Sequence, residues 1–213
     1  MLHNRNKNMN FIEFRKKMFD LACFNINQIY AWQPDFNRNN LVRWTNSGHI
    51  IRLRQGYYTF PEYKGRPDYP FWFANRIYRP SYISLHTALA FYGMIPEEVT
   101  QITSVTSLKT AGFSNPFGEY SYKSVKENLM FGYDLKSIAD GRTISFARPE
   151  KALLDLLYLF PFYDSELELE ELRLDENYVN EDLNKDLLEK YTNRFENKAL
   201  EHRVSLLINT YGL

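Results

Sequence analysis

The sequence predicts an α+β protein, with a helical N-terminal region that ends in a hairpin and a mixed α/β region after it. Three observations support this prediction. Helix-capping and helix-ending residues recur at short intervals between residues 10 and 48. Runs rich in β-branched and aromatic residues, with glycines in their connections, follow between residues 100 and 146. Apolar residues with helical spacing then start at Pro149.

The first two helices are predicted over residues 11–22 and 26–33. Each is preceded by an asparagine with a Glu or Gln three residues later, the spacing of a capping box. The two pairs are Asn10 with Glu13 and Asn25 with Gln28. Pro34 ends the second helix, because proline lacks the N–H group that a helix interior needs.

A third helix is predicted over residues 36–47, with Asp35 as its N-cap and Gly48 after its last turn. The connection from the second helix is then about three residues long, the spacing of a helix-turn-helix. The apolar residues that can face inward are Phe36, Leu41 and Trp44. The residues left on the outward face are Arg38, Asn39, Val42, Arg43 and Asn46.

A short hairpin is predicted directly after the third helix. Residues 49–53 and 57–60 form its strands, and Arg54-Gln55-Gly56 forms its turn. A hairpin in this position, with Arg52 and Arg54 near its tip, is typical of the wing of a winged helix-turn-helix.

The outward residues of the third helix and the hairpin have the chemistry of a DNA reader. Arginine and asparagine match the hydrogen-bonding edges of guanine and adenine, and arginines on a wing can bind phosphate or the minor groove. The candidate DNA-binding residues are Arg38, Asn39, Arg43, Asn46, Arg52, Arg54 and Gln55. Winged helices also serve as protein-binding modules, and this alternative stays open.

Charge is distributed unevenly along the chain, although the formal net charge is zero. Residues 1–80 contain 13 basic and 5 acidic side chains, whereas residues 151–213 contain 7 basic and 14 acidic ones. A basic N-terminal region favours a polyanionic partner, although two solvated surfaces would give the same totals. The clustering of arginines on the third helix and the hairpin favours the first interpretation, a polyanionic partner.

The composition is that of a globular chain. Hydrophobic residues make up 44% of the 213 residues and aromatic residues 16%, enough for a sizeable core. No stretch reaches the roughly 20 apolar residues of a membrane helix, and residues 1–10 lack the apolar centre of a signal peptide. The single cysteine, Cys23, excludes an internal disulfide. We therefore expect a cytoplasmic protein without a membrane partner.

The chain is expected to divide into two domains. Residues 63–70 are rich in proline, glycine and charge, which predicts a linker. We place the winged helix-turn-helix with its linker at residues 1–66 and an α+β effector domain at residues 67–213. In the second domain, helices are expected over 71–78, 85–92 (capped by Ser84), 149–160, 181–191 and 197–211, and strands over 100–107, 120–125, 129–134 and 142–146.

Little in the sequence indicates an enzyme. The four histidines have no cysteine or carboxylate at metal-ligand spacing, and neither a phosphate-binding loop nor a nucleophile elbow is present. The glutamates between residues 166 and 171 indicate a solvated acidic surface. We therefore predict no catalytic residues, metal site or cofactor, although catalytic groups can converge from distant positions.

Five runs of the sequence resemble the AbiEi antitoxin family. Residues 40–44 (NLVRW) and 48–58 (GHIIRLRQGYY) resemble its winged-helix head. The later runs are 74–84 (ANRIYRPSYIS), 88–97 (ALAFYGMIPE) and 148–155 (RPEKALLD). The resemblance covers roughly residues 10–160 and leaves the acidic last fifty residues outside it.

The resemblance implies a cytoplasmic antitoxin or antitoxin-like repressor. In that family the head binds repeats in its own promoter, and a neighbouring gene encodes a nucleotidyltransferase toxin. Such a type IV antitoxin counteracts the toxin without a stable complex. The function predicted from the sequence is thus a DNA-binding, autorepressing antitoxin. The alternative is a stand-alone regulator, or a winged-helix protein-interaction module, without a toxin partner.

Overall fold

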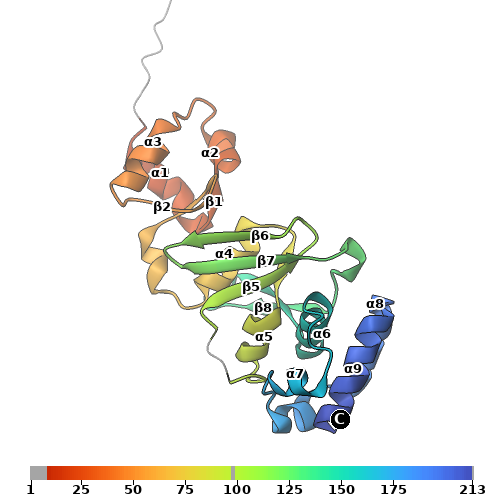
Figure 1. Cartoon of the computed structure of the whole chain (residues 1–213). Helices are drawn as coiled ribbons and strands as arrows, with labels where there is room; N and C mark the ends of the chain where they lie inside the picture. Colours follow the sequence, from red (N-terminus) through yellow and green to blue (C-terminus); the bar gives the residue numbers. More distant parts are fainter. Residues whose placement is uncertain (1–8, 97–98, 213) are drawn as a thin grey trace, which may run out of the picture. The chain divides into compact units, whose positions relative to one another are not determined.

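The structure is a computed structural model that describes residues 9–96 and 99–212. The chain divides into two compact units, Met1–Tyr69 with Ser114–Phe117 and Pro70–Phe113 with Gly118–Leu213. Helices and strands occur in both units (Figure 1), so the predicted α+β class is confirmed. The last residue of the run 88–97, Glu97, lies outside the described residues.

The first unit combines short helices with a three-stranded antiparallel sheet in the order β1-β3-β2. Strand β1 was not predicted, because its two residues become a strand only by pairing with β3. The elements are α1 (Phe11–Met18), a 3₁₀ turn (Phe19–Leu21), β1 (Phe24–Asn25), α2 (Ile26–Trp32), α3 (Asn39–Asn46), β2 (Ile51–Arg54), β3 (Tyr57–Thr59) and a second 3₁₀ turn (Pro61–Gly65).

Aromatic rings form the core of the first unit. The ring of Phe14, on α1, lies 4.6 Å from that of Trp44 on α3 and 5.4 Å from that of Phe24 on β1. It also lies 5.8 Å from the ring of Phe36 and 6.3 Å from that of Phe60. Rings at these separations bury large apolar areas in specific orientations. The cluster therefore fixes the position of α3 relative to α1 and the sheet.

The capping predictions differ in outcome between the first two helices. The capping box of α2 is confirmed, since Gln28 N donates to Asn25 Oδ1 at 3.0 Å and Asn25 N donates to Gln28 Oε1 at 2.9 Å. Asn10 also caps α1, but it accepts from Ile12 N at 3.0 Å, so the predicted box with Glu13 is wrong. Helix α1 ends at Met18, four residues earlier than predicted, and continues as a 3₁₀ turn.

Helix α3 begins three residues later than predicted, and Asp35 is not its N-cap. Phe36 is buried before the helix starts, and Phe36 N donates to Gln33 O in a turn. Asn37 Oδ1 then accepts from Asn39 N at 3.0 Å. The connection between α2 and α3 is therefore six residues long, Gln33–Arg38, because the ring of Phe36 must reach the aromatic core.

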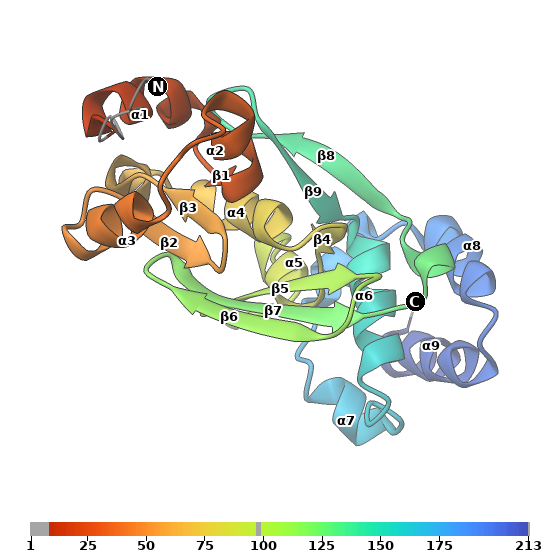
Figure 2. The ribbon, with the colours of Figure 1, turned by 90° about the horizontal axis from the view of Figure 1, so that it is seen from above.

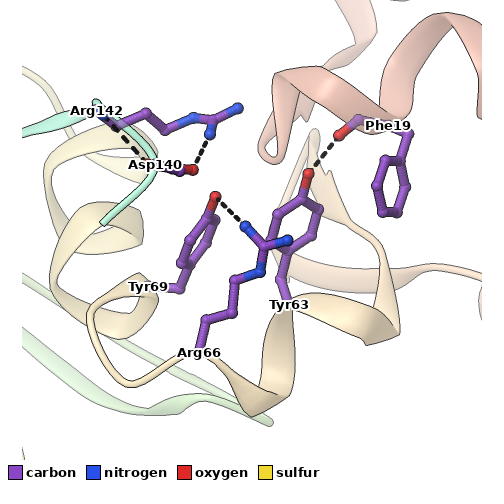
Figure 3. Close-up of polar contacts among 6 residues, drawn as sticks. All are labelled: Phe19, Tyr63, Arg66, Tyr69, Asp140 and Arg142. Atoms are coloured by element: carbon purple, nitrogen blue, oxygen red, sulfur yellow. Dashed lines mark hydrogen bonds and ion pairs between the residues drawn. The ribbon is translucent and has the colours of Figure 1, made fainter. Parts of the chain in front are cut away.

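The segment predicted as a linker is packed against the first unit (Figure 3). Tyr63 is buried, and its hydroxyl donates to Phe19 O at 2.7 Å. Its ring stacks on that of Tyr69 at 4.7 Å. The guanidinium of Arg66 lies over both rings and donates to the hydroxyl of Tyr69 at 3.3 Å. These contacts hold residues 63–69 in a defined conformation within the first unit, whose first segment ends at Tyr69, three residues after the predicted boundary.

The second unit contains a six-stranded mixed sheet in the order β6-β7-β5-β4-β9-β8. Strand β4 pairs antiparallel with β5 and parallel with β9, while β5 and β7 are parallel and β8 and β9 antiparallel. The strands are β4 (Ser81–Ile83), β5 (Gln101–Thr106), β6 (Ala111–Asn115), β7 (Gly118–Ser124), β8 (Tyr133–Ser137) and β9 (Thr143–Ala147).

Helices cover the sheet of the second unit and extend its core. Helix α5 packs on β5 and on α6, which also contacts β9. Helices α8 and α9 pack against α6 and against each other (Figure 2). The helices are α4 (Tyr69–Ile77), α5 (Leu85–Phe91), α6 (Pro149–Leu159), α7 (Glu166–Glu170), α8 (Lys185–Phe195) and α9 (Lys198–Tyr211), with a π-helical turn (Tyr178–Asp182) before α8.

Four elements of the second unit differ from the prediction in presence or position. Strands β4 and β6 were missed, and the strand expected over 129–134 lies at 133–137, after a 3₁₀ turn (Glu127–Leu129). The helix expected over 181–191 is shifted to Lys185–Phe195, because Asn184 caps it through Leu187 N at 2.9 Å. Within the described ranges, no helix is long and apolar enough to cross a membrane.

A buried ion pair lies at the centre of the second unit. Lys151 and Asp155, one turn apart on α6, are both completely buried and form an ion pair. The carboxylate of Asp155 also accepts from the hydroxyl of Tyr82 at 2.9 Å and from that of Ser84 at 2.8 Å. Ser84 therefore does not cap α5 with its side chain, contrary to the prediction. Burial raises the pKa of Asp155 and lowers the pKa of Lys151, and the ion pair opposes both shifts.

Gly132 is expected to tolerate no side chain, because its φ is +70° and a Cβ there would approach Lys151 Cγ to 3.0 Å. It would also lie 2.9 Å from Tyr191 Cε2. Gly132→Ala should therefore lose about 1–3 kcal/mol more stability than Gly141→Ala. Gly141 is a matched control, since its φ is +81° and a Cβ added there would meet nothing within 4 Å. Urea unfolding measures both variants, and equal losses would contradict the clash.

The first turn of α7 is expected to loosen in acid. Glu168 Oε2 accepts from Asp164 N at 3.0 Å and from Ser165 Oγ at 2.9 Å, and these bonds lower the pKa of Glu168 below its usual 4.5. Because the pKa of Glu168 is lower in the folded state than in the unfolded state, the two bonds stabilise the folded state fully at pH values above the unfolded-state pKa. This stabilisation is lost as the pH falls through the folded-state pKa. An NMR titration should show the Asp164 amide shifting clearly further below pH 4.5 in the wild type than in Glu168→Gln, where only the carboxyl group of Asp164 itself still acts on it.

Candidate nucleic-acid interface

The outward face of α3 is polar, basic and exposed. Asn39, Arg43 and Asn46 follow one another at three- and four-residue spacing, so they share one face of the helix. With Val42 and Ser47 they line a shallow groove. Leu41 and Trp44 are buried on the opposite face, as predicted. The predicted division of this helix into an inward and an outward face is confirmed.

Arg38 stands just before α3 and is held by α2. Its Nε donates to the hydroxyl of Tyr30 at 2.7 Å, and its guanidinium lies 5.4 Å from the centre of that ring. The bond uses one of several N–H donors of the guanidinium. The remaining donors can still form the paired bonds by which arginine binds guanine or phosphate. The contact with Tyr30 therefore reduces the freedom that Arg38 would lose on binding.

Arg43 is positioned in a similar way from within α3. One terminal nitrogen of its guanidinium donates to Asn40 Oδ1 at 2.8 Å, and Asn40 is buried. The arginine itself stays exposed. Tyr30 and Asn40 were not among the predicted site residues. The three-residue spacing of Asn40 and Arg43 was the sequence signal for one of these contacts, whereas the contact from Tyr30 depends on how α2 and α3 pack.

The β2–β3 hairpin supplies two further arginines. Arg52 is exposed opposite Tyr58, and Arg54 pairs with Tyr57 across a bulge. The guanidinium of Arg54 lies 5.9 Å from the centre of the Tyr57 ring. Leu53, which lies between Arg52 and Arg54 in the strand, points to the core and is buried.

The turn of this hairpin presents Gln55. Gln55 is exposed, and Gly56 after it has φ +82°, a left-handed conformation that favours glycine. Both strands are shorter than predicted. Arg54, which was predicted in the turn, is the last residue of β2, and the turn consists of Gln55 and Gly56.

All seven predicted DNA-binding residues thus lie in the first unit. Six are exposed, and Arg54 is half-buried. Residues 36–60 contain four arginines and no aspartate or glutamate, so this segment has a net positive charge. Such a surface can bind phosphates through charge and read base edges through amide and guanidinium groups.

No three His, Cys, Asp or Glu side chains within residues 9–96 and 99–212 are grouped so that they could hold a metal ion. Cys23, the single cysteine, is buried. No model of a known protein family matches the chain, and no curated protein matches its sequence. The resemblance to the AbiEi family therefore rests on the five sequence runs alone.

Proposed function

We propose that the first unit is a winged helix-turn-helix that binds double-stranded DNA, and that the protein is a transcriptional regulator. The main support is the outward face of α3, where Asn39, Arg43 and Asn46 are exposed together while Leu41 and Trp44 anchor the helix in the core. A helix presented in this way can enter the major groove. The connection before α3 is longer than that of a typical helix-turn-helix, but Phe36 in it is fixed in the core.

The two arginine-bearing elements have different proposed roles. Arg38 and Arg43, with Asn39 and Asn46, would contact base edges and so determine sequence preference. Arg52 and Arg54 of the hairpin, with Gln55 at its turn, would contact phosphates or the minor groove and so add affinity without much sequence preference.

A gel-shift titration with the full chain and the duplex upstream of its own gene tests this proposal. If four arginines neutralise phosphates or lie in the grooves, raising the salt from roughly 50 to 200 mM should weaken binding about a hundredfold. The absence of binding to this duplex and to genomic fragments would contradict DNA binding. A protein partner that is still captured after substitution of Arg38 and Arg43 would instead indicate a protein-interaction module.

We further propose that the regulator is an autorepressing antitoxin opposed to a nucleotidyltransferase toxin. This proposal is supported by the resemblance of the runs 40–44, 48–58, 74–84, 88–97 and 148–155 to the AbiEi family. Co-expression with a nucleotidyltransferase encoded beside the gene should relieve the growth arrest that this enzyme causes alone. Persistent arrest, with the chain folded and bound to its duplex, would indicate a stand-alone regulator.

A further inference from the structure

A polar cavity of about 520 Å³ lies in the second unit, between the end of α4 and the strands β4, β8 and β9. Its volume is within the range of small-molecule sites. The lining residues that determine its chemistry are Asn75, Arg76 and Arg79 from α4 and the turn after it, Ser81 from β4, and Tyr133 and Leu135 from β8.

The charge of this cavity is positive. Arg76 and Arg79 both line it and are both exposed, and none of the described residues that line it carries a carboxylate. The guanidinium of Arg76 lies 4.8 Å from the centre of the Trp72 ring, which restrains it at the cavity wall. Two guanidinium groups in one lining favour an anionic ligand, and phosphate in particular.

Two buried donors in the same lining lack partners in the part of the chain that the structure describes. Asn75 is only 9% exposed, and its Oδ1 accepts from Ser145 N at 2.6 Å, which fixes the orientation of the amide. Its Nδ2 is then left buried with no hydrogen-bond partner among the described residues, and the same is true of Ser81 Oγ. Buried donors are nearly always paired in folded proteins, so two unpaired donors beside two arginines indicate acceptors supplied by a ligand.

The other side of the cavity offers a flat ring. Tyr133 is 39% exposed, and one face of its ring stacks on the ring of Tyr82, with centres 4.7 Å apart and planes 17° from parallel. Leu135, two residues along β8 and therefore on the same face of the strand, is also largely exposed. Stacking and apolar contacts of this kind suit a planar ring.

We propose that this cavity binds a mononucleotide, with its phosphate on Arg76, Arg79 and the free donors of Asn75 and Ser81, and its base against Tyr133 and Leu135. The site lies wholly in the second unit, so it does not depend on the proposed DNA interface. A regulator with such a site would have a means of responding to a nucleotide pool.

The proposal is tested by calorimetric and thermal-shift titrations of the full chain with four probes. The probes are a set of nucleoside monophosphates, the corresponding nucleosides, inorganic phosphate and a short single-stranded oligonucleotide. We expect saturable binding and a concentration-dependent rise in Tm with at least one monophosphate, and much weaker effects with the nucleosides and with phosphate. Arg79→Gln should weaken that binding about ten- to a hundredfold, whereas Lys126→Gln, at an exposed cation of the same unit outside the cavity, should not.

A second variant addresses the buried donor. Asn75→Asp keeps an oxygen for Ser145 N but replaces the free Nδ2 with a negatively charged oxygen, so it should abolish binding of the monophosphate. If the Asn75→Asp variant does not fold, the Arg79→Gln variant still tests the proposal, because Arg79 is exposed and its replacement should not affect folding. No binding of any monophosphate, binding unchanged in Arg79→Gln, phosphate bound as tightly as the monophosphates, or a preference for the oligonucleotide would each overturn the proposal.

Discussion

Asp155→Ala is expected to lower the free energy of unfolding by about 3–5 kcal/mol, because it would leave the ammonium of Lys151 buried without its partner. The hydroxyls of Tyr82 and Ser84 would lose their common acceptor in the same step. Urea unfolding followed by circular dichroism gives the loss of stability. Hydrogen exchange should locate that loss in the second unit, around α6 and β4.

Matched variants separate the ion pair from the packing around it. Asp155→Asn keeps most of the shape of the side chain and an acceptor for Ser84 but removes the charge. It should therefore lower the free energy of unfolding by less than Asp155→Ala does. Replacing both partners, as Lys151→Met with Asp155→Leu, should cost less than Asp155→Ala alone, because no uncompensated charge stays buried. A loss below about 1 kcal/mol in Asp155→Ala would show that the pair is not the buried centre of this unit.

The double variant Arg38→Ala, Arg43→Ala is expected to lose about 2–4 kcal/mol of binding free energy for the upstream duplex, at least roughly thirtyfold in affinity. Both arginines lie at the proposed reading face, and each is already restrained, Arg38 by Tyr30 and Arg43 by Asn40. Binding to an unrelated duplex should fall less, because that binding depends mainly on phosphate contacts. Fluorescence anisotropy with both duplexes at one salt concentration gives the two affinities.

Two controls belong to this measurement. Lys185→Ala with Lys190→Ala removes two exposed cations from α8 in the second unit and should leave the preference for the upstream duplex unchanged. Arg52→Ala with Arg54→Ala should instead weaken binding to both duplexes by similar factors. An Arg38→Ala, Arg43→Ala protein that is folded and retains full preference for the upstream duplex would exclude α3 as the reading element.

Local rules predicted the parts of the first unit that depend on nearby residues. The capping box of α2 and the turn at Gln55 and Gly56 involve residues at most three apart, so the sequence contains all the information they need. The inward positions of Leu41 and Trp44 follow from helical spacing. The start of α3 depends instead on Phe36, whose ring packs in the core against Phe14, distant in sequence, and against Trp44 of α3 itself. The prediction that Asp35 caps α3 was therefore wrong.

The features that were missed depend on long-range packing. Strands β1 and β4 have only two and three residues and are defined by partners far along the chain. Lys151 and Asp155 have the four-residue spacing that commonly marks an exposed ion pair, and only the packing of α6 shows that both are buried. In the candidate site, the exposed residues were predictable from the face of a helix, whereas the bond from Tyr30 was not.

Photo-crosslinking from α3 tests most directly whether this helix lies against DNA. A photoreactive amino acid at Val42, which is 60% exposed in the middle of the outward face, should crosslink to the upstream duplex. The same group at Leu167, 69% exposed on α7 of the second unit, is the matched control. We expect a salt-sensitive crosslink from position 42 and little from position 167. A bound duplex that crosslinks from position 167 but not from position 42 would contradict the proposed role of α3.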